Sequence, residues 1–274
     1  MRLDFHTHCF PDPLAARAIQ KVGHNAGDLL PHTDGTLDGL AALMRRQGVD
    51  RFVVLNIATN ARQMRDVNDF AARMSEREEV VGFGSVHPKA ENVMEELERI
   101  KALGLKGVKF QFDYQGLYVD DPCMKPIYRK IAQLGLVTMI HAGFDYGFAP
   151  PYMAPPERIA NALRWVDSPF IASHWGGLSC AEGVLKHLCG LPLYFDTSYG
   201  YGAIAAPTAA RILEKHGVER FLFGSDCPWH TPEMELRLLG SLGLSESEMD
   251  RVCWKNGAAL LGLDCDNKTE DLTI

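Results

Sequence analysis

The sequence predicts an α/β protein folded as a single (β/α)8 barrel, the TIM barrel. Eight short runs of β-branched and apolar residues alternate with longer segments whose apolar residues recur at helical spacing. No linker, internal repeat or low-complexity segment divides the 274 residues, and such barrels take about 250 residues as one domain. An open doubly wound sheet is the alternative, but no Gly-x-Gly-x-x-Gly turn follows the first run.

The expected strands are short and end near polar or glycine residues. In chain order they cover Leu3–Cys9, Arg51–Ile57, Val80–Val86, Gly107–Phe112, Val137–His141, Phe170–His174, Leu193–Thr197 and Arg220–Ser225.

The expected helices lie between these strands, and several end just before a glycine: Gly48, Gly104, Gly135 or Gly217. The segments with the clearest helical spacing are Ala61–Glu78, Glu91–Leu103, Met124–Leu134, Pro156–Val166, Pro207–His216, Pro232–Gly240 and Glu246–Leu261. The barrel is expected to span residues 1–263, and a polar tail follows at 264–274.

Two connections are longer than the others, at His24–Gly35 and Phe144–Pro155. Both follow a strand and are rich in Gly, Pro or aromatic residues, so we expect them over the mouth of the barrel. Tyr146 and its aromatic neighbours in the second connection form either a lid over a ligand or a loop that packs on itself or on a neighbouring subunit.

The composition favours small-molecule chemistry. The chain has 28 Lys and Arg against 35 Asp and Glu, a net charge of −7, and no run rich in Lys or Arg. Such a chain is a poor partner for nucleic acid or an anionic membrane surface. We therefore expect a small-molecule substrate, with no nucleic acid or membrane partner. Because barrels of this kind often pair through their mouth loops, we expect a homodimer.

The cysteines and the first residues indicate a reducing compartment. The seven cysteines include no Cys-x-x-Cys pair, which fits neither a disulfide framework nor a thiolate zinc site. Charges and histidines occupy the first ten residues, where a signal peptide needs an apolar stretch, and no run approaches about 18 apolar residues. We therefore expect a cytoplasmic location.

Histidines at strand ends predict a metal site. His6 and His8 lie two apart on the first strand, so both side chains point to one face and can bind one ion. His141, His174 and Asp226 end strands five, six and eight. In a barrel these ends converge on the face where active sites are built. Each residue alone could be a cap or a core residue, but together they suit a catalytic zinc or similar divalent ion.

Five motifs resemble the amidohydrolase superfamily, and more narrowly its amidohydrolase-related branch of metal-dependent hydrolases and decarboxylases similar to aminocarboxymuconate-semialdehyde decarboxylase. They are HTHCFP at 6–11, GVKF at 107–110, IHAG at 140–143, SHWGG at 173–177 and FGSDCPW at 223–229. The resemblance implies that His6, His8, His141 and Asp226 bind one metal.

The resemblance leaves the number of metals open. It makes His174 either a ligand of a second metal or a catalytic residue. Lys109 occupies the place where binuclear members carry a carboxylated lysine, but it can equally bind a substrate carboxylate, and we favour that role and one metal per chain. The expected cofactor is Zn²⁺, with Mn²⁺ or another divalent ion as alternatives. Related sequences often have a histidine where this chain has Gln111.

The expected activity is metal-dependent hydrolysis of an amide, ester or lactone bond in a small molecule. A divalent ion lowers the pKa of its water, and Asp226 can move the proton to the leaving group while His174 stabilises the developing charge. The alternative is non-oxidative decarboxylation of an aromatic or unsaturated acid, with Asp226 as proton donor. A third reading is a binding barrel without catalysis.

Further residues are candidates for substrate binding or packing. We expect Lys109, His87, Trp175, Tyr146 and Trp229 to contact the substrate. For His87 and the tryptophans a structural role at the barrel rim is the alternative. Cys9 and Cys227 adjoin proposed ligands but have the opposite strand parity, so we expect them to face away from the metal.

Overall fold

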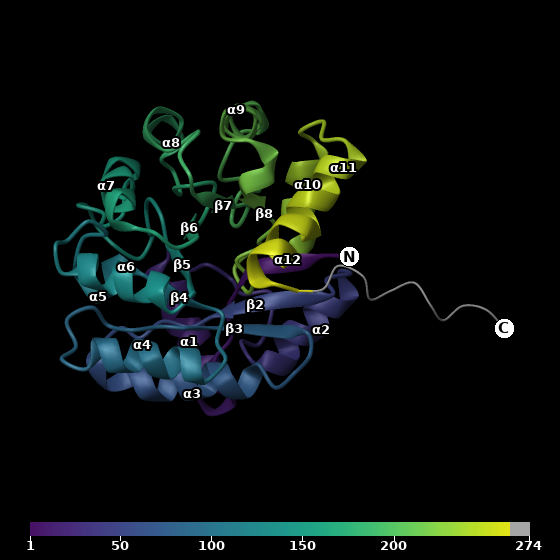
Figure 1. The fold of residues 1–274 in the computed structure, drawn as a ribbon. Coiled ribbons are helices and arrows are strands. Elements are labelled where there is room, and N and C mark those ends of the chain that lie inside the picture. Colours follow the sequence, from purple (N-terminus) through teal and green to yellow (C-terminus); the bar gives the residue numbers. More distant parts are fainter. Residues whose placement is uncertain (264–274) are drawn as a thin grey trace.

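The computed structural model describes residues 1–263 as one eight-stranded barrel surrounded by helices (Figure 1). The predicted polar tail at 264–274 lies outside the described residues. All neighbouring strands pair in parallel and follow one another in chain order, which confirms the predicted fold. The strands are β1 (Leu3–Thr7), β2 (Arg51–Leu55), β3 (Val80–Gly84), β4 (Gly107–Phe110), β5 (Val137–Ile140), β6 (Phe170–Ala172), β7 (Tyr194–Asp196) and β8 (Phe221–Leu222).

The barrel closes between β1 and the chain that follows β8. Phe5 N–H donates to the carbonyl oxygen of Phe223 at 2.7 Å, Asp226 N–H to that of His6 at 2.8 Å, and His8 N–H to that of Cys227 at 2.7 Å. The β1 register is irregular between Asp4 and Thr7. Such irregularities turn side chains at barrel rims, and here this one lies beside His6.

Twelve helices are described within residues 1–263, where no helix is long and apolar enough to cross a membrane. They are α1 (Asp12–Asn25), α2 (Leu37–Arg46), α3 (Met64–Met74), α4 (Val93–Ala102), α5 (Phe112–Gln115), α6 (Met124–Gln133), α7 (Pro156–Ala162), α8 (Ala181–His187), α9 (Ala206–His216), α10 (Pro232–Gly240), α11 (Glu246–Asp250) and α12 (Asn256–Leu261). Short 3₁₀ turns occupy Ala61–Gln63, Leu163–Trp165 and Val218–Arg220, and a π-helical turn spans Arg251–Lys255.

Local sequence signals account for several of these boundaries. The Thr36 side chain caps α2 by accepting from Gly39 N–H, and Ser245 with Glu248 forms a capping box at α11. The four glycines predicted to terminate helices all have positive φ, between 63° and 96°. This conformation costs glycine little because it has no Cβ.

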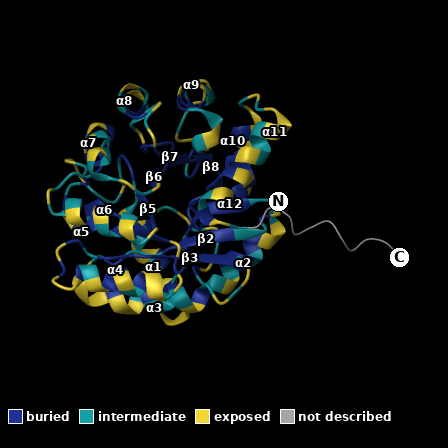
Figure 2. Cartoon of the chain, in the orientation of Figure 1, coloured by how far each residue is buried: buried dark blue, intermediate teal, exposed yellow. Residues whose placement is uncertain are grey.

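Two layers of apolar side chains hold the barrel together. The inner layer fills the barrel and includes Phe5, Phe83 and Met139, with Trp254 and Ala258 packed against it. The outer layer lies between strands and helices. Figure 2 shows the strands almost wholly buried, whereas the outer faces of α3 and α4 are exposed. The carboxyl ends of the strands thereby stand on a rigid base.

The predicted strands extend one to three residues too far at their carboxyl ends. The extra residues include His141 and His174, which lie past the strands and line the cavity at the barrel mouth. The predicted segment Glu246–Leu261 is interrupted by the π-helical turn at Arg251–Lys255. The predicted long connection at His24–Gly35 does not follow β1 directly, because α1 lies between them and ends at Asn25.

Candidate metal centre and cavity

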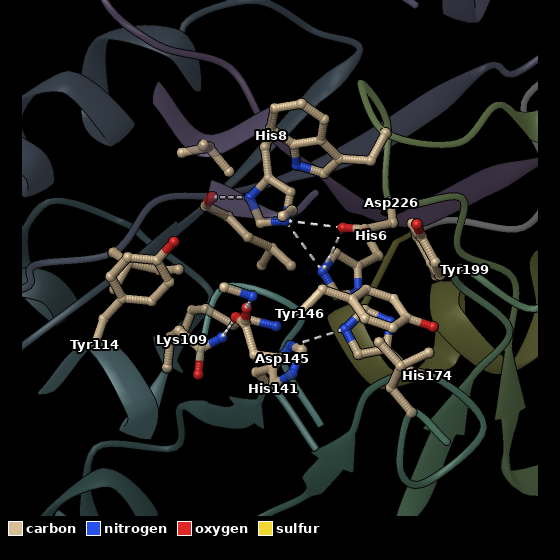
Figure 3. A pocket seen from close by; sticks show the side chains of 18 of the residues that line it. His6, His8, Lys109, Tyr114, His141, Asp145, Tyr146, His174, Tyr199 and Asp226 are labelled. Atoms are coloured by element: carbon tan, nitrogen blue, oxygen red, sulfur yellow. Dashed lines mark hydrogen bonds and ion pairs between the residues drawn. The ribbon is translucent and has the colours of Figure 1, made fainter. Parts of the chain in front are cut away.

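A cavity of about 230 Å³ opens at the carboxyl ends of the strands (Figure 3). Its size is near the lower limit of small-molecule pockets, about 300 Å³. All five predicted catalytic or metal residues line it: His6, His8, His141, His174 and Asp226. The predicted convergence of strand ends is therefore present in the structure.

Hydrogen bonds determine which nitrogens of His6 and His8 carry protons. His6 Nδ1 lies 2.8 Å from Asp196 Oδ2, and His8 Nδ1 lies 2.7 Å from the carbonyl oxygen of Leu55. A carbonyl oxygen or a carboxylate accepts, so both Nδ1 atoms donate and both Nε2 atoms present bare lone pairs. Burial, followed by the charge of Lys109, holds the pKa of His6 well below its usual value. His6 is therefore neutral, as a metal ligand must be.

Asp226 brings a carboxylate oxygen to the same point. Its Oδ1 lies 3.1 Å from His8 Nε2 and 3.4 Å from His6 Nε2. Burial acts to raise the pKa of Asp226, but His6 and His8 outweigh it and the pKa is lowered. Asp226 has φ of 70°, and non-glycine residues in this region occur where the surrounding structure imposes them, often at functional sites.

These three atoms fit a divalent ion. His6 Nε2 and His8 Nε2 are 3.2 Å apart, and with both rings neutral neither Nε2 carries a proton to place between them or toward Asp226. Without a cation, the lone pairs of the two nitrogens and of the carboxylate oxygen would face one another at these distances and repel. Ligand atoms at about 2.05 Å from a tetrahedral zinc are separated by about 3.3 Å. The spacing and the chemistry of the donors thus agree with a metal site.

His141 and His174 form a second pair beside this triad. His141 Nε2 donates to the carbonyl oxygen of Phe144 at 2.8 Å, which leaves Nδ1 bare. That Nδ1 lies 3.0 Å from His174 Nε2. Within the described chain, no group of three or more residues whose ligand atoms all lie within 4.8 Å of one another includes His141. Three of the four predicted ligands therefore come together, and the ligand role of His141 stays a prediction.

Asp196 and Ser198 connect the two groups of histidines. Ser198 donates its proton to Asp196 Oδ1 in a very short contact, and its oxygen lies 2.9 Å from His174 Nδ1. Ser198 therefore accepts from His174 Nδ1, and His174 Nε2 faces His141 as a second bare nitrogen. Burial, followed by His141 and His6, keeps the pKa of His174 well below its usual value. The pair is arranged to share a proton or a cation.

Lys109 is a buried cation at the cavity. Its Nζ donates to Ser173 Oγ at 3.1 Å, and the residue is 1% exposed. Burial lowers its pKa to about 8, against the opposing charges of Asp196 and Asp226. Lys109 is the only lysine or arginine that lines the cavity within residues 1–263, so the described cavity offers one ammonium group to an anionic substrate.

The residues predicted to bind substrate divide into two groups. Lys109, Tyr146 and Trp229 line the cavity, whereas His87 and Trp175 lie outside its lining. Trp175 has φ of 59°, and its indole N–H donates to the carbonyl oxygen of Thr197 at 3.0 Å, so its ring packs within the fold. The structural alternative fits Trp175 better than the predicted substrate contact.

The loop after β5 packs partly on itself and partly lines the cavity. Phe144 stacks on Tyr152 with ring centroids 4.0 Å apart, which supports the self-packing alternative. Tyr146 and Asp145 nevertheless line the cavity. Gln111 Nε2 donates to Asp145 Oδ2 at 2.6 Å. Gln111, whose role the sequence left open, thus fastens this loop to the end of β4.

Sequence reasoning missed several residues of the site. Asp196 ends β7 as Asp226 follows β8, so the same strand-end criterion could have identified it. Tyr114 and Tyr199 line the cavity without belonging to any motif. Cys9 and Cys227 are fully buried in the outer apolar layer, as their strand parity predicts.

Residues 3–263 match the sequence model of the amidohydrolase family. No curated protein matches the chain significantly. Among solved structures, 5-carboxyvanillate decarboxylase from Sphingomonas paucimobilis aligns with a TM-score of 0.72 at 16% identity, over 96% of this chain and 99% of its own.

Two further structures show the same relationship. A dihydroxybenzoic acid decarboxylase from Polaromonas, with bound manganese and the inhibitor 2-nitroresorcinol, gives a TM-score of 0.72 at 16% identity over 100% of this chain and 99% of its own. A probable 2-pyrone-4,6-dicarboxylic acid hydrolase from Acinetobacter baumannii, with citric acid bound, gives 0.69 at 17% identity over 96% and 99%. At these identities the likeness shows a shared fold.

Proposed function

The chain belongs to the amidohydrolase family, and on this premise we propose that it is a metal-dependent hydrolase of an amide, ester or lactone bond in a small molecule. The observation that carries the proposal is the convergence of His6 Nε2, His8 Nε2 and Asp226 Oδ1 within 3.4 Å of one another. These atoms would hold one divalent ion, with His141 as a proposed fourth ligand. We propose zinc, since imidazoles with one carboxylate suit it.

The bound ion would supply a water of lowered pKa and would polarise the scissile carbonyl group. Asp226 is the residue placed to accept a proton from the attacking water, because its carboxylate is ionised and lines the cavity. The water oxygen bonds to the carbonyl carbon, the bond from that carbon to nitrogen or oxygen breaks, and Asp226 returns the proton to the departing atom.

His174 would support this transfer from a position next to His6, with the two ring centroids 4.9 Å apart. Its Nε2 is bare and its Nδ1 bonds to Ser198, which donates to Asp196. A proton taken up at Nε2 would therefore be stabilised by a buried carboxylate through the serine. Lys109 would bind a negative group of the substrate, since it is the one lysine or arginine that lines the cavity within residues 1–263.

Decarboxylation is the second candidate, and the composition of the cavity wall favours it. Phe10, Val22, Leu29, Leu55 and Trp229 give one side an apolar surface. A carboxylate placed in such surroundings is poorly solvated, which favours its loss as carbon dioxide. Two of the structures compared above bear the names of decarboxylases of aromatic acids.

One assay series separates the two candidates. Zinc-loaded and manganese-loaded protein is incubated with small aromatic acids, with their esters and amides, and with lactones. Hydrolysis consumes water and releases an acid without carbon dioxide, whereas decarboxylation releases carbon dioxide. Ester, amide or lactone cleavage that disappears on chelation supports the first candidate. Release of carbon dioxide alone would replace it by the second, and no turnover by either metal form would overturn both.

A further inference from the structure

A buried, hydrogen-bonded pair of a histidine and a glutamate lies next to the cavity but outside its lining. His230 Nδ1 lies 2.7 Å from Glu235 Oε1, and Glu235 is fully buried. The other carboxylate oxygen, Oε2, accepts from the backbone N–H groups of Gly200 at 2.9 Å and Tyr201 at 3.0 Å. Glu235 on α10 therefore fastens the loop that follows β7 to the segment that follows β8. Neither His230 nor Glu235 takes part in the reaction proposed above.

The residue held between these contacts is Tyr199. It immediately precedes the two anchored N–H groups and has φ of 54°, in the left-handed region that tyrosine rarely adopts. Its ring stacks on the His230 ring, with centroids 4.0 Å apart and planes inclined by 18°. The backbone and the ring of Tyr199 are thus fixed by the same buried pair, Glu235 through the backbone and His230 through the ring.

Tyr199 faces the cavity beside the proposed metal ligands. It lines the cavity, and Figure 3 shows it near Asp226. Burial, followed by the charge of Asp226, raises the pKa of Tyr199 to about 12. A tyrosine hydroxyl already carries its proton at neutral pH at its ordinary pKa of about 10, and it can donate that proton in a hydrogen bond. No hydrogen bond from the hydroxyl is found within residues 1–263, so this donor is free for a ligand.

We propose that Tyr199 is a substrate-contacting residue whose hydroxyl donates a hydrogen bond to an oxygen of the bound substrate, and that Glu235 and His230 are its positioning residues. The contact rests on the proposed function, because it requires a small oxygen-bearing substrate in this cavity. The positioning role does not rest on the proposed function, because the stacking and backbone contacts are present whether or not the protein turns over a substrate. Tyr146 also lines the cavity, and its ring centroid lies 6.0 Å from that of Tyr199.

The first experiment measures position without using turnover. 3-Fluorotyrosine is placed at residue 199 of the metal-loaded protein and followed by ¹⁹F NMR. We expect one sharp resonance that shifts or broadens in Glu235→Gln and in His230→Phe, which retains a ring but loses the bond to Glu235. Glu233→Gln is the matched control, because Glu233 is an exposed glutamate on the same helix and its side chain pairs with Arg237. A resonance unchanged in both test variants would overturn the positioning role.

Benzoate tests the contact in the same sample. As a small aromatic acid, it should shift the residue 199 resonance of the otherwise unmodified protein. An absence of any shift would overturn the substrate contact, whether or not the protein proves to be a hydrolase. A shift without any turnover of esters, amides, lactones or acids would instead count against the proposed function and leave this contact standing.

The kinetic test compares the loss of kcat/KM in two single variants with the loss in the double variant. Tyr199→Phe keeps the stacked ring and removes only the hydroxyl, and we expect about a 10- to 100-fold loss of kcat/KM. Glu235→Gln should cause a smaller loss, and the double variant should lose no more than Tyr199→Phe alone, since Glu235 acts through that hydroxyl. Losses that multiply would overturn the positioning role and make Glu235 a purely structural residue.

Discussion

The backbone N–H of Asp226 donates to the carbonyl oxygen of His6 at 2.8 Å. This hydrogen bond belongs to the seam that closes the barrel between β1 and the chain after β8. The side chains of the same two residues approach to 3.4 Å at the proposed metal site. Closure of the barrel and assembly of the metal site therefore depend on the same few residues.

Metal binding should consequently stabilise the whole barrel. A ligand present at 100 times its dissociation constant stabilises the folded state by about 2.7 kcal/mol. We expect chelation to lower the melting temperature, and about one zinc or manganese per chain to restore it. Elemental analysis and thermal denaturation of the stripped and reloaded protein measure both.

The matched variants for this prediction are His8→Ala and His24→Ala. His8 contributes one of the three converging atoms, whereas His24 is an exposed histidine paired with Asp28. His8→Ala should abolish most of the metal-dependent gain in melting temperature, and His24→Ala should retain it. Equal responses of the two variants would contradict the assignment of His8.

Asp226→Asn should remove most of the activity while retaining part of the metal. The amide can still offer one oxygen, but it cannot accept and return a proton, and general acid–base catalysis contributes about 10²- to 10⁴-fold. We expect a loss of kcat in that range. The metal content of the purified variant is the control, and full turnover by a metal-loaded variant would disprove the proton-transfer role.

The sequence predicted the barrel and the strand-end histidines because both depend on local spacing. Period-two alternation placed His6 and His8 on one face, and the order of strands brought Asp226 beside them. The network around them was not predictable in this way. Ser198 contacts His174 and Asp196 only because the chain turns sharply after β7, and the turn at Tyr199 has a φ that tyrosine does not prefer.

The same limit explains the placement of Trp175. Its neighbour His174 has φ of 58° and Trp175 has φ of 59°, so strand alternation no longer determines where either side chain points. His174 turns into the cavity and Trp175 into the fold. Sequence spacing predicts which residues reach the barrel mouth, but left-handed turns decide which of them face the cavity.

Lys109→Met should weaken the binding of anionic substrates more than that of neutral ones. Methionine fills a similar volume in this buried site without a charge. A charged hydrogen bond contributes about 1.5 to 3 kcal/mol, so we expect KM for an acid to rise about 10- to 100-fold. KM for the neutral amide or ester of the same acid should change little.

Lys106→Met is the control for this comparison, because Lys106 lies just before β4 and is exposed to solvent. It should leave both KM values near those of the unmodified protein. A parallel rise of KM for acid and neutral substrates in Lys109→Met would show a structural effect and contradict the anion-binding role.

Protonation of His216, which does not line the cavity, should destabilise the barrel in acid. It is buried, its Nε2 donates to the carbonyl oxygen of Leu193 at 2.9 Å, and its Nδ1 accepts from Gly190 N–H at 3.2 Å. Burial lowers its pKa from 6.5 to about 4. Between these values the unfolded chain binds more protons than the folded chain, so stability rises with pH through this window.

The size of the effect follows from the shift. About 1.4 kcal/mol per pKa unit gives a loss of about 3 kcal/mol from this one residue as the pH falls from about 6.5 to about 4. His216→Gln offers an acceptor and a donor but does not titrate, so its free energy of unfolding should fall less over this range. Denaturant unfolding of metal-free protein at several pH values measures the difference, and identical slopes for the two proteins would show that His216 does not carry the acid sensitivity.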